Sequence, residues 1–333
     1  MNHHRIELPQ NEFCIFMTAM RKQLISVLLT LIGFHIPLEG RAALEFRWLG
    51  NTGFLLSDGE RTLLFDPAVT STPLHRWVLP FLGVKSDPDE LDYWMKRCGV
   101  NQLAATFVNH THTDHAIDAP SATLRYGGIV AGSHSLKQIA LGHGVPEERI
   151  RVLRDREIVQ VGRFEIQAIV TPHSPHFMNI TLAEGHIDHP LKPGSNPWLY
   201  RVGEMLSYSI SHPEGRVLFQ APGRVLTPDV LADFKPDTLL LTIANRTSSR
   251  DLIQQRILTS GAQLTIPLHW DNFFLPMNRT GKPRPLWFQN VDEFRETAQK
   301  LAPNAPLLWP EYCTPLSLPT RVTQRRGNPP PSL

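Results

Sequence analysis

The 333-residue sequence lacks the features that would assign it to several large classes of protein. Its formal net charge is only +2 and it has no long basic run, so nothing in it indicates binding to nucleic acid. It has no Gly-x-Ser-x-Gly segment, no Walker phosphate loop and no Gly-x-Gly-x-x-Gly segment. With 41% hydrophobic and 19% charged residues, the composition is that of an ordinary globular protein.

The sequence also has no apolar run long enough for a comfortable membrane span. The basic pair at residues 21–22 precedes an apolar run at residues 24–38, which Gly40-Arg41-Ala42 follows. A basic start, a short apolar run and small residues at a cleavage site predict a secretory signal peptide, with Ala43 as the first mature residue. A buried N-terminal helix or a membrane anchor is the alternative.

The sequence therefore predicts three parts: a leader at residues 1–42, one folded domain at residues 43–312 and a proline-rich mobile tail at residues 313–333. A later methionine start would leave residues 1–19 untranslated. We expect a periplasmic or secreted protein without a stable membrane span after the leader is cleaved.

Cysteine is scarce, with three in the chain. Cys14 would be lost with the leader, and Cys98 and Cys313 would remain. An oxidising compartment permits a disulfide between them, but the sequence leaves open whether they are close.

Apolar alternation and turn signals indicate hairpins first, and then strands that alternate with helices. Strands are expected at residues 44–49, 53–57, 62–65, 104–108, 128–131, 158–161, 164–170, 206–210, 217–220, 238–243 and 263–267. Helices are expected at residues 88–97, 116–125, 135–141, 250–258 and 291–300. This order, repeated twice, suggests two sheets with helices outside.

The chain is rich in histidine, with 15 residues, and three of them lie in the segment His110-Thr111-His112-Thr113-Asp114-His115 after a predicted strand. In an extended segment the His110 and His112 rings project to the same side. Imidazole and carboxylate groups are suitable ligands for zinc, iron or manganese. The segment therefore predicts that His110 and His112 hold one metal ion and that Asp114 and His115 serve a second. A polar loop with hydrogen-bonded histidines is the alternative.

His-x-His-x-Asp-His after an apolar strand resembles the signature of the metallo-β-lactamase superfamily. Residues 48–54, followed by residues 63–67, look like the opening of the branch with ascorbate-phosphate lactonases and N-acyl-phosphatidylethanolamine phospholipases. The resemblance covers residues 44–312. It implies an α/β (α+β) fold, a four-layer αββα sandwich with the metal site at the edges of its sheets.

The resemblance also implies two further histidine ligands. His173 follows the strand expected at residues 164–170, and His176 is the competing choice. His269 follows the last expected strand, and Asp271 is either a carboxylate that orients a ligand or a plain turn residue. The expected metal ligands are therefore His110, His112, Asp114, His115, His173 and His269.

One departure from the family pattern concerns the aspartate that usually bridges two metal ions after a middle strand. The corresponding residues 217–223 contain no acid, and Asp229 is too far downstream. Asp114, His115 and His269 would still offer two imidazoles and one carboxylate to a metal. Gln220 would be a weaker, neutral ligand. A mononuclear site, an altered metal preference and an inactive site all stay open.

In this superfamily a metal ion lowers the pKa of a bound water, and the resulting hydroxide attacks a carbonyl or phosphoryl centre. The resemblance implies a hydrolase, with one or two zinc ions expected, that cleaves an ester, lactone, amide or phosphodiester bond. Asp114 would be catalytic, orienting the nucleophile and handling its proton. The alternative is a non-catalytic or mononuclear metal-binding protein on the same fold. A diiron oxidoreductase would normally need the bridging carboxylate and a flavin domain, and the sequence shows neither.

The expected partner is a small-molecule or lipid-like substrate. The loop at residues 174–200, which carries His186, His189 and Trp198, is expected to shape the pocket. The apolar residues of 72–84 form either another wall or simple packing against the core, and the sequence slightly favours packing. His186 and His189 lack the strand context of a metal site and are expected at the surface.

Overall fold

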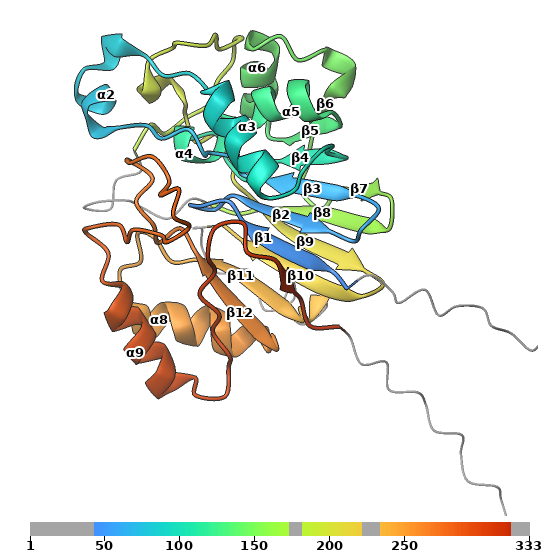
Figure 1. Ribbon diagram of the computed structural model, residues 1–333, viewed down its shortest axis with the longest axis vertical. Coiled ribbons are helices and arrows are strands. Elements are labelled where there is room, and N and C mark those ends of the chain that lie inside the picture. The colour runs from blue at the N-terminus through green and yellow to red at the C-terminus, as the bar shows by residue number, and fades with distance from the viewer. Residues whose placement is uncertain (1–42, 173–181, 222–233, 321–333) are drawn as a thin grey trace, which may run out of the picture. The chain divides into compact units, whose positions relative to one another are not determined.

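The computed structural model describes residues 43–172, 182–221 and 234–320, in which two β-sheets pack face to face between helices (Figure 1). The first sheet has the strand order β13-β1-β2-β3-β4-β5-β6. Its strands are β1 (Glu45–Trp48), β2 (Phe54–Ser57), β3 (Thr62–Phe65), β4 (Ala105–Phe107), β5 (Ile129–Gly132), β6 (Ile150–Val152) and β13 (Leu316–Ser317). Hairpins make β1, β2 and β3 antiparallel, whereas β3 to β6 run parallel.

The second sheet has the strand order β12-β11-β10-β9-β8-β7. Its strands are β7 (Ile158–Val161), β8 (Phe164–Val170), β9 (Leu206–His212), β10 (Gly215–Gln220), β11 (Thr238–Thr242) and β12 (Leu264–Leu268). Strands β7 to β10 are antiparallel, and β10 to β12 are parallel. Each sheet therefore contains a parallel part, whose strands all end at the same edge.

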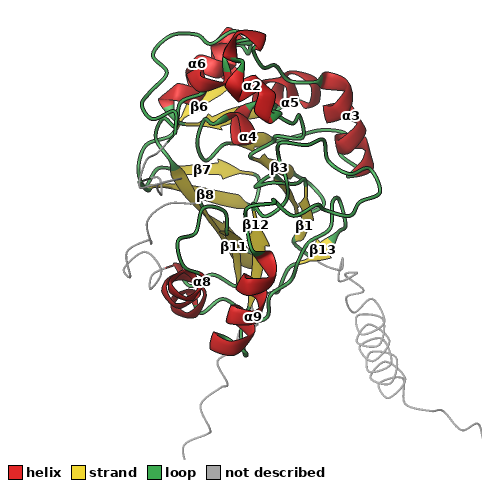
Figure 2. Ribbon diagram, turned by 90° about the vertical axis from the view of Figure 1, so that its left-hand side faces the viewer, coloured by secondary structure: helices red, strands yellow, loops and turns green. Residues whose placement is uncertain are grey.

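Helices cover the outer faces of both sheets, as Figures 1 and 2 show. The first sheet carries α3 (Pro88–Arg97), α5 (Ala119–Tyr126) and α6 (His134–Gly142), and the second carries α8 (Ser249–Leu252) and α9 (Val291–Leu301). The shorter elements are α2 (Leu74–Val78), η1 (Pro80–Leu82), α4 (Thr113–Ala116), η2 (Glu147–Arg149), η3 (Pro197–Leu199) and η4 (Ile253–Leu258). No described helix has the length and hydropathy needed to cross a membrane.

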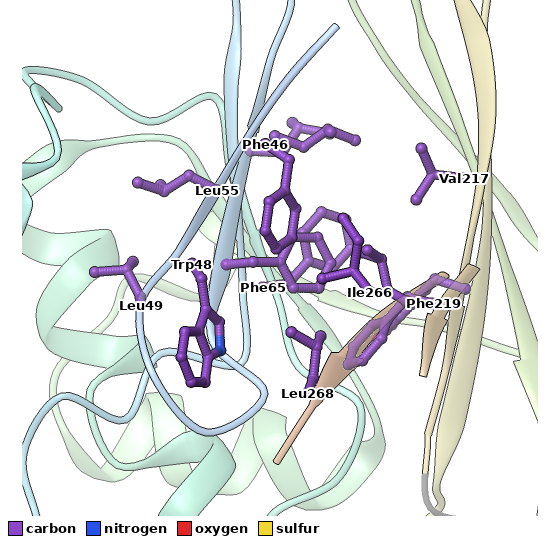
Figure 3. Close-up of a cluster of buried hydrophobic side chains, with 14 of the residues drawn as sticks. Phe46, Trp48, Leu49, Leu55, Phe65, Val217, Phe219, Ile266 and Leu268 are labelled. Atoms are coloured by element: carbon purple, nitrogen blue, oxygen red, sulfur yellow. The ribbon is translucent and has the colours of Figure 1, made fainter. Parts of the chain in front are cut away.

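Aromatic side chains fill the space between the two sheets (Figure 3). The Phe54 and Phe65 ring centroids lie 4.5 Å apart, and the Phe219 ring from the other sheet meets Phe54 edge-on at 5.0 Å. Leu55 points to the opposite side of its strand because side chains alternate along a strand. Each aromatic pair adds about 1 kcal/mol beyond the burial of its surface, so these contacts hold the sheets in register.

The αββα sandwich expected from the sequence is confirmed, and β3, β7, β8 and α3 have the expected bounds. The stretch at residues 70–87, in which the sequence predicted no helix, contains the short elements α2 and η1. The expected start of the mobile tail at residue 313 is wrong, because Cys313 is buried and Leu316–Ser317 pairs with β1. The leader and residues 321–333 lie outside the described residues.

Cys98, at the end of α3, and Cys313, before β13, form a disulfide with sulfur atoms 1.94 Å apart. The bond joins positions 215 residues apart in sequence and fastens the last strand to the first helical layer.

We expect the Cys98→Ser/Cys313→Ser variant to lose about 2–5 kcal/mol of unfolding free energy, because a long loop is no longer closed in the unfolded chain. Urea unfolding with and without reductant measures this loss. Reductant should destabilise the wild-type protein and leave the double variant unchanged. Equal unfolding midpoints for both proteins under oxidising conditions would contradict the expectation.

The Asp118 carboxylate, before α5, fastens both ends of the segment that carries α2. It accepts hydrogen bonds from the Thr70 backbone N–H at 2.8 Å, from the Thr70 hydroxyl at 2.7 Å and from the Ser86 hydroxyl at 2.6 Å. Burial raises the pKa of Asp118 to about 6, and these hydrogen bonds only partly oppose it.

Because the folded pKa lies above the unfolded value, the wild-type protein should lose stability as pH rises through the range from about 4 to 6. From pH 4.5 to 7.5 this group alone should cost about 2 kcal/mol of unfolding free energy. Asp118→Asn has no ionisable carboxyl and should lack this component. Urea unfolding of both proteins at the two pH values tests this, and identical pH dependence would refute it.

Candidate metal centre

The histidine-rich segment begins where buried strand β4 ends. Asn109 donates its backbone N–H to the Asp66 carboxylate at 2.7 Å, so the segment starts against the end of neighbouring strand β3. His112 then precedes the single turn of α4, and this turn carries Asp114 and His115. Both residues therefore lie in a short helix that is separate from α5, the helix expected from residue 116.

Asp114, His115 and His269 converge in space although His269 comes from the end of β12 in the other sheet. One ligand atom from each lies within 4.8 Å of the others. The Asp114 Oδ2 atom is 3.5 Å from His115 Nε2 and 3.4 Å from His269 Nε2. The structure thus brings together the three residues that the sequence assigned to a second metal ion.

His110 and His112 lie beside this group. Their Nε2 and Nδ1 atoms are 3.1 Å apart, and the His110 and His115 ring centroids are 3.9 Å apart. His112 Nε2 also lies 3.0 Å from the Leu182 carbonyl oxygen. Five of the six predicted ligands therefore form one cluster, and the sixth, His173, lies outside the described residues, as does His176.

A buried carboxylate that the sequence analysis did not single out orients His115. The Asp66 Oδ2 atom lies 2.9 Å from His115 Nδ1, and the Thr52 hydroxyl lies 2.8 Å from the same nitrogen. A proton on Nδ1 directed at Asp66 leaves Nε2 as the lone-pair nitrogen facing Asp114 and His269. The signal was present in the sequence, since Asp66 directly follows β3, the parallel neighbour of β4.

Asp271 and Asn51 together hold the turn that carries His269. Its carboxylate accepts hydrogen bonds from the Asn51 backbone N–H at 2.8 Å and from the Tyr312 hydroxyl at 2.6 Å. The Asn51 carbonyl in turn accepts the His269 N–H at 2.8 Å, and the Asn51 side-chain amide donates to the Asp114 carbonyl. Asp271 therefore supports the predicted ligands through Asn51.

Three of the residues around the cluster adopt the left-handed backbone conformation. The φ angles of Asn51, Asp66 and His269 are 49°, 43° and 60°. Non-glycine residues rarely adopt this conformation, and strained backbone of this kind concentrates at functional sites. The hydrogen bonds described above hold these conformations in place.

The electrostatics of the cluster favour a negatively charged Asp114. Burial raises the pKa of its carboxyl group, but His115, His269 and His112 together outweigh burial and hold the pKa well below its usual range. Within the described residues no lysine or arginine pairs with Asp114; its ion-pair partners there are imidazoles. A partly buried carboxylate among imidazoles is a donor set that fits a divalent metal ion such as zinc, iron or manganese.

The end of β10 offers no acid to this cluster within the described residues. Gln220 is buried, its backbone carbonyl accepts the Thr242 hydroxyl at 3.2 Å, and its side chain does not line the pocket. Residues 222–233, which include Asp229, lie outside the described residues. The weak ligand role considered for Gln220 stays a prediction.

The cluster forms the floor of a cavity of about 1180 Å³. Leu74 and Trp77 of α2 form part of one wall together with Trp198. Trp198 belongs to the loop at residues 174–200, which the sequence predicted to shape the pocket. For residues 72–84 the sequence slightly favoured packing against the core. This expectation is wrong for Leu74 and Trp77, which line the cavity, and for Phe81, which is 81% exposed. His186 and His189 are exposed and do not line the cavity.

A second wall comes from the segment after His269 and was not recognised in the sequence. It includes Phe273, Phe274, Trp287 and Phe288. These residues lie in loops without periodicity, so no sequence pattern connected them to the metal ligands.

Comparison with known proteins gives the class of this fold. No family model matches the chain. Its sequence is 23% identical over 236 residues to a UPF0173 metal-dependent hydrolase of Chloroflexus aurantiacus, covering 70% of this chain and 88% of that protein. The metallo-β-lactamase fold protein YhfI from Bacillus subtilis has a TM-score of 0.50 at 14% identity, covering 82% of this chain and 99% of that one.

Two further solved structures are similar. Isothiocyanate hydrolase from Delia radicum gut bacteria has a TM-score of 0.56 at 14% identity and covers 84% of this chain and 100% of that one. Igni18, a metallo hydrolase from Ignicoccus hospitalis, has a TM-score of 0.50 at 15% identity and covers 82% and 97%. The chain has the metallo-β-lactamase fold, and its predicted resemblance to this superfamily is confirmed. The narrower resemblance to one branch stays a prediction.

The contact between Asp66 and His115 should affect how tightly the cluster binds a metal ion. We expect Asp66→Asn to weaken metal binding about 10- to 100-fold, because the carboxylate that orients His115 is lost. Competition with a chromogenic chelator measures the affinity. Asp58→Asn is the matched control, because Asp58 is an equally buried carboxylate bound to a histidine, His212, at 3.3 Å. Equal losses in both variants would indicate a general folding effect.

Proposed function

We propose that this protein is a metal-dependent hydrolase. The observation that carries the proposal is the convergence of Asp114, His115 and His269 beside His110 and His112 on the floor of a large cavity. The metal-dependent hydrolase of Chloroflexus aurantiacus supports the proposal as a relative in sequence. His110, His112 and His173 would hold one ion, and Asp114, His115 and His269 a second.

A divalent metal bound there would act as a Lewis acid and make water a better nucleophile near neutral pH. The protein's own contribution is geometric. Asp66 fixes the proton of His115 on Nδ1, and Asn51 holds the α4 turn through the Asp114 carbonyl. The charged Asp114 carboxylate would orient the attacking water and accept its proton. The cavity walls would hold the substrate and limit the access of bulk water.

The proposed reaction class is hydrolysis of an ester, lactone, amide or phosphodiester bond, with zinc as the proposed metal and iron or manganese as alternatives. The second candidate function is a non-catalytic or mononuclear metal-binding protein. It is favoured by the absence of a carboxylate at the described end of β10, where Gln220 stands.

We also propose that the protein works in an oxidising compartment, the periplasm or the cell exterior. The Cys98–Cys313 disulfide supports this location, because disulfides persist in such compartments and are rare in reducing ones. The basic and apolar pattern of residues 21–42 supports export.

Elemental analysis of the purified protein tests the proposed site. We expect about two equivalents of metal in the wild-type protein, and about one fewer in His110→Ala and in His269→Ala, because each variant removes an imidazole ligand from a different ion. His186→Ala is the control, since His186 is exposed and outside the cavity, and its metal content should not change.

One equivalent of metal that only His110→Ala removes would favour the mononuclear alternative. A wild-type protein without metal after reconstitution would refute the hydrolase proposal. A screen of esters, lactones and phosphodiesters then separates the enzyme from the non-catalytic metal binder.

A further inference from the structure

The cavity above the metal cluster is larger than a metal site needs. Pockets for drug-sized ligands typically measure about 300–1,000 Å³, and this one measures about 1180 Å³. Only its floor, with Asp114, His115 and His269, carries the polar groups proposed for the chemistry. Beyond the floor, the lining combines aromatic and aliphatic side chains with a polar part formed by residues 245–250 and 289–297.

The first wall is held firmly in place. The Trp77 and Trp198 rings meet edge-on with centroids 5.1 Å apart, and Trp198 Nε1–H donates to the Trp77 carbonyl at 2.9 Å. Asp118 anchors both ends of the segment that carries Trp77. The indole N–H of Trp198 is therefore paired within the protein, and the indole N–H of Trp77 is buried without a partner among the described residues. The indole rings give this wall a mainly apolar surface.

The second wall starts beside the metal cluster and extends to the rim. The Phe273 ring lies 5.3 Å from the His269 ring and packs on Phe274 with centroids 4.3 Å apart. Farther out, Trp287 is 71% exposed and Phe288 is 48% exposed, with centroids 4.9 Å apart. Large side chains exposed beside a cavity usually mark a surface that an apolar ligand covers.

Two charged residues on the cavity lining, Arg246 and Glu293, pair with each other. Arg246 lies 3.5 Å from the Glu293 carboxylate and donates to the Ser249 hydroxyl at 2.7 Å and to the Ile243 carbonyl at 3.1 Å. The Arg246 guanidinium therefore already has partners within the protein. The other arginine on the lining, Arg250, is exposed and belongs to the polar part of the lining. The parts suited to an apolar group are the Trp77–Trp198 wall and the Phe273–Phe274 wall.

We propose that the substrate carries a large apolar group, such as a medium or long acyl chain, next to the bond that is cleaved, and that Trp287 determines this preference. This inference rests on the proposed hydrolase function and adds the substrate class to it. The acyl chain lies between the Trp77–Trp198 wall and the Phe273–Phe274 wall and passes under Trp287 at the rim. Each buried methylene should raise kcat/KM roughly fourfold until the cavity is filled.

The metal-loaded protein is assayed with p-nitrophenyl decanoate and p-nitrophenyl butyrate below their aggregation limits. We expect kcat/KM to be at least about 50-fold higher for decanoate. Trp287→Ala should lower the decanoate-to-butyrate ratio at least about fivefold, since an aromatic contact area is removed. Phe81→Ala is the matched control: Phe81 is 81% exposed but does not line the cavity, so the ratio should stay unchanged.

Calorimetric titration with 2-undecanone and 2-butanone separates this inference from the hydrolase proposal, because ketones bind without being cleaved. Saturable binding of 2-undecanone that Trp287→Ala weakens and Phe81→Ala does not would support the inference even if no ester is hydrolysed. Equal rates for both esters, or no saturable 2-undecanone binding, would overturn it. The ester assays are repeated with anionic phospholipid vesicles present. If Phe81→Ala and Trp287→Ala lower the decanoate rate equally, and only with vesicles, the inference is overturned in favour of docking on a lipid surface.

Discussion

The Asp66 carboxylate makes the contact on which the rest of the site depends. One oxygen accepts the Asn109 N–H and thereby joins the ends of two parallel strands, and the other lies against His115 Nδ1. Because parallel strands end at a common edge, side chains that follow β3 and β4 meet there. In the second sheet, His269 follows β12, which is also a parallel strand, and it meets the residues of the first sheet where the two sheets end side by side. Asp66 is fully buried, so its contacts to the backbone and to His115 are not weakened by exchange with water.

Aromatic residues occur both in the core between the sheets and around the open cavity at their edge, but they serve different purposes in the two places. Phe54, Phe65 and Phe219 meet within a closed core, where each face has a partner. Trp287 and Phe288 are joined to each other, and a large part of their surface is left to solvent. The first arrangement stabilises the fold, and the second leaves a surface available for a ligand. The Cys98–Cys313 bond stabilises a different place, where the last strand has few residues with which to pair.

Much of the architecture was predictable because it depends on local periodicity. The alternation in β7 and β8, and the Asp-Pro start and Gly stop of α3, determine their bounds within short segments. The predicted start of the tail was wrong because composition indicated a loose end, whereas Leu316–Ser317 pairs with β1, which lies far away in sequence. In the stretch 70–87, the length of α2 is only five residues, too short for a periodic signal.

Within the site, the sequence by itself determined the segment from His110 to His115, because all of its ligands are neighbours in the chain and their residue types suit a metal. The resemblance to the metallo-β-lactamase superfamily added His269, which follows a predicted strand. The tertiary structure alone decided that Asp114 Oδ2 lies between His115 and His269, that Asp66 and Asn51 orient the cluster, and that Cys98 meets Cys313. The physical reason is that these contacts join segments separated by many residues, and their geometry follows from the packing of two sheets rather than from any local pattern.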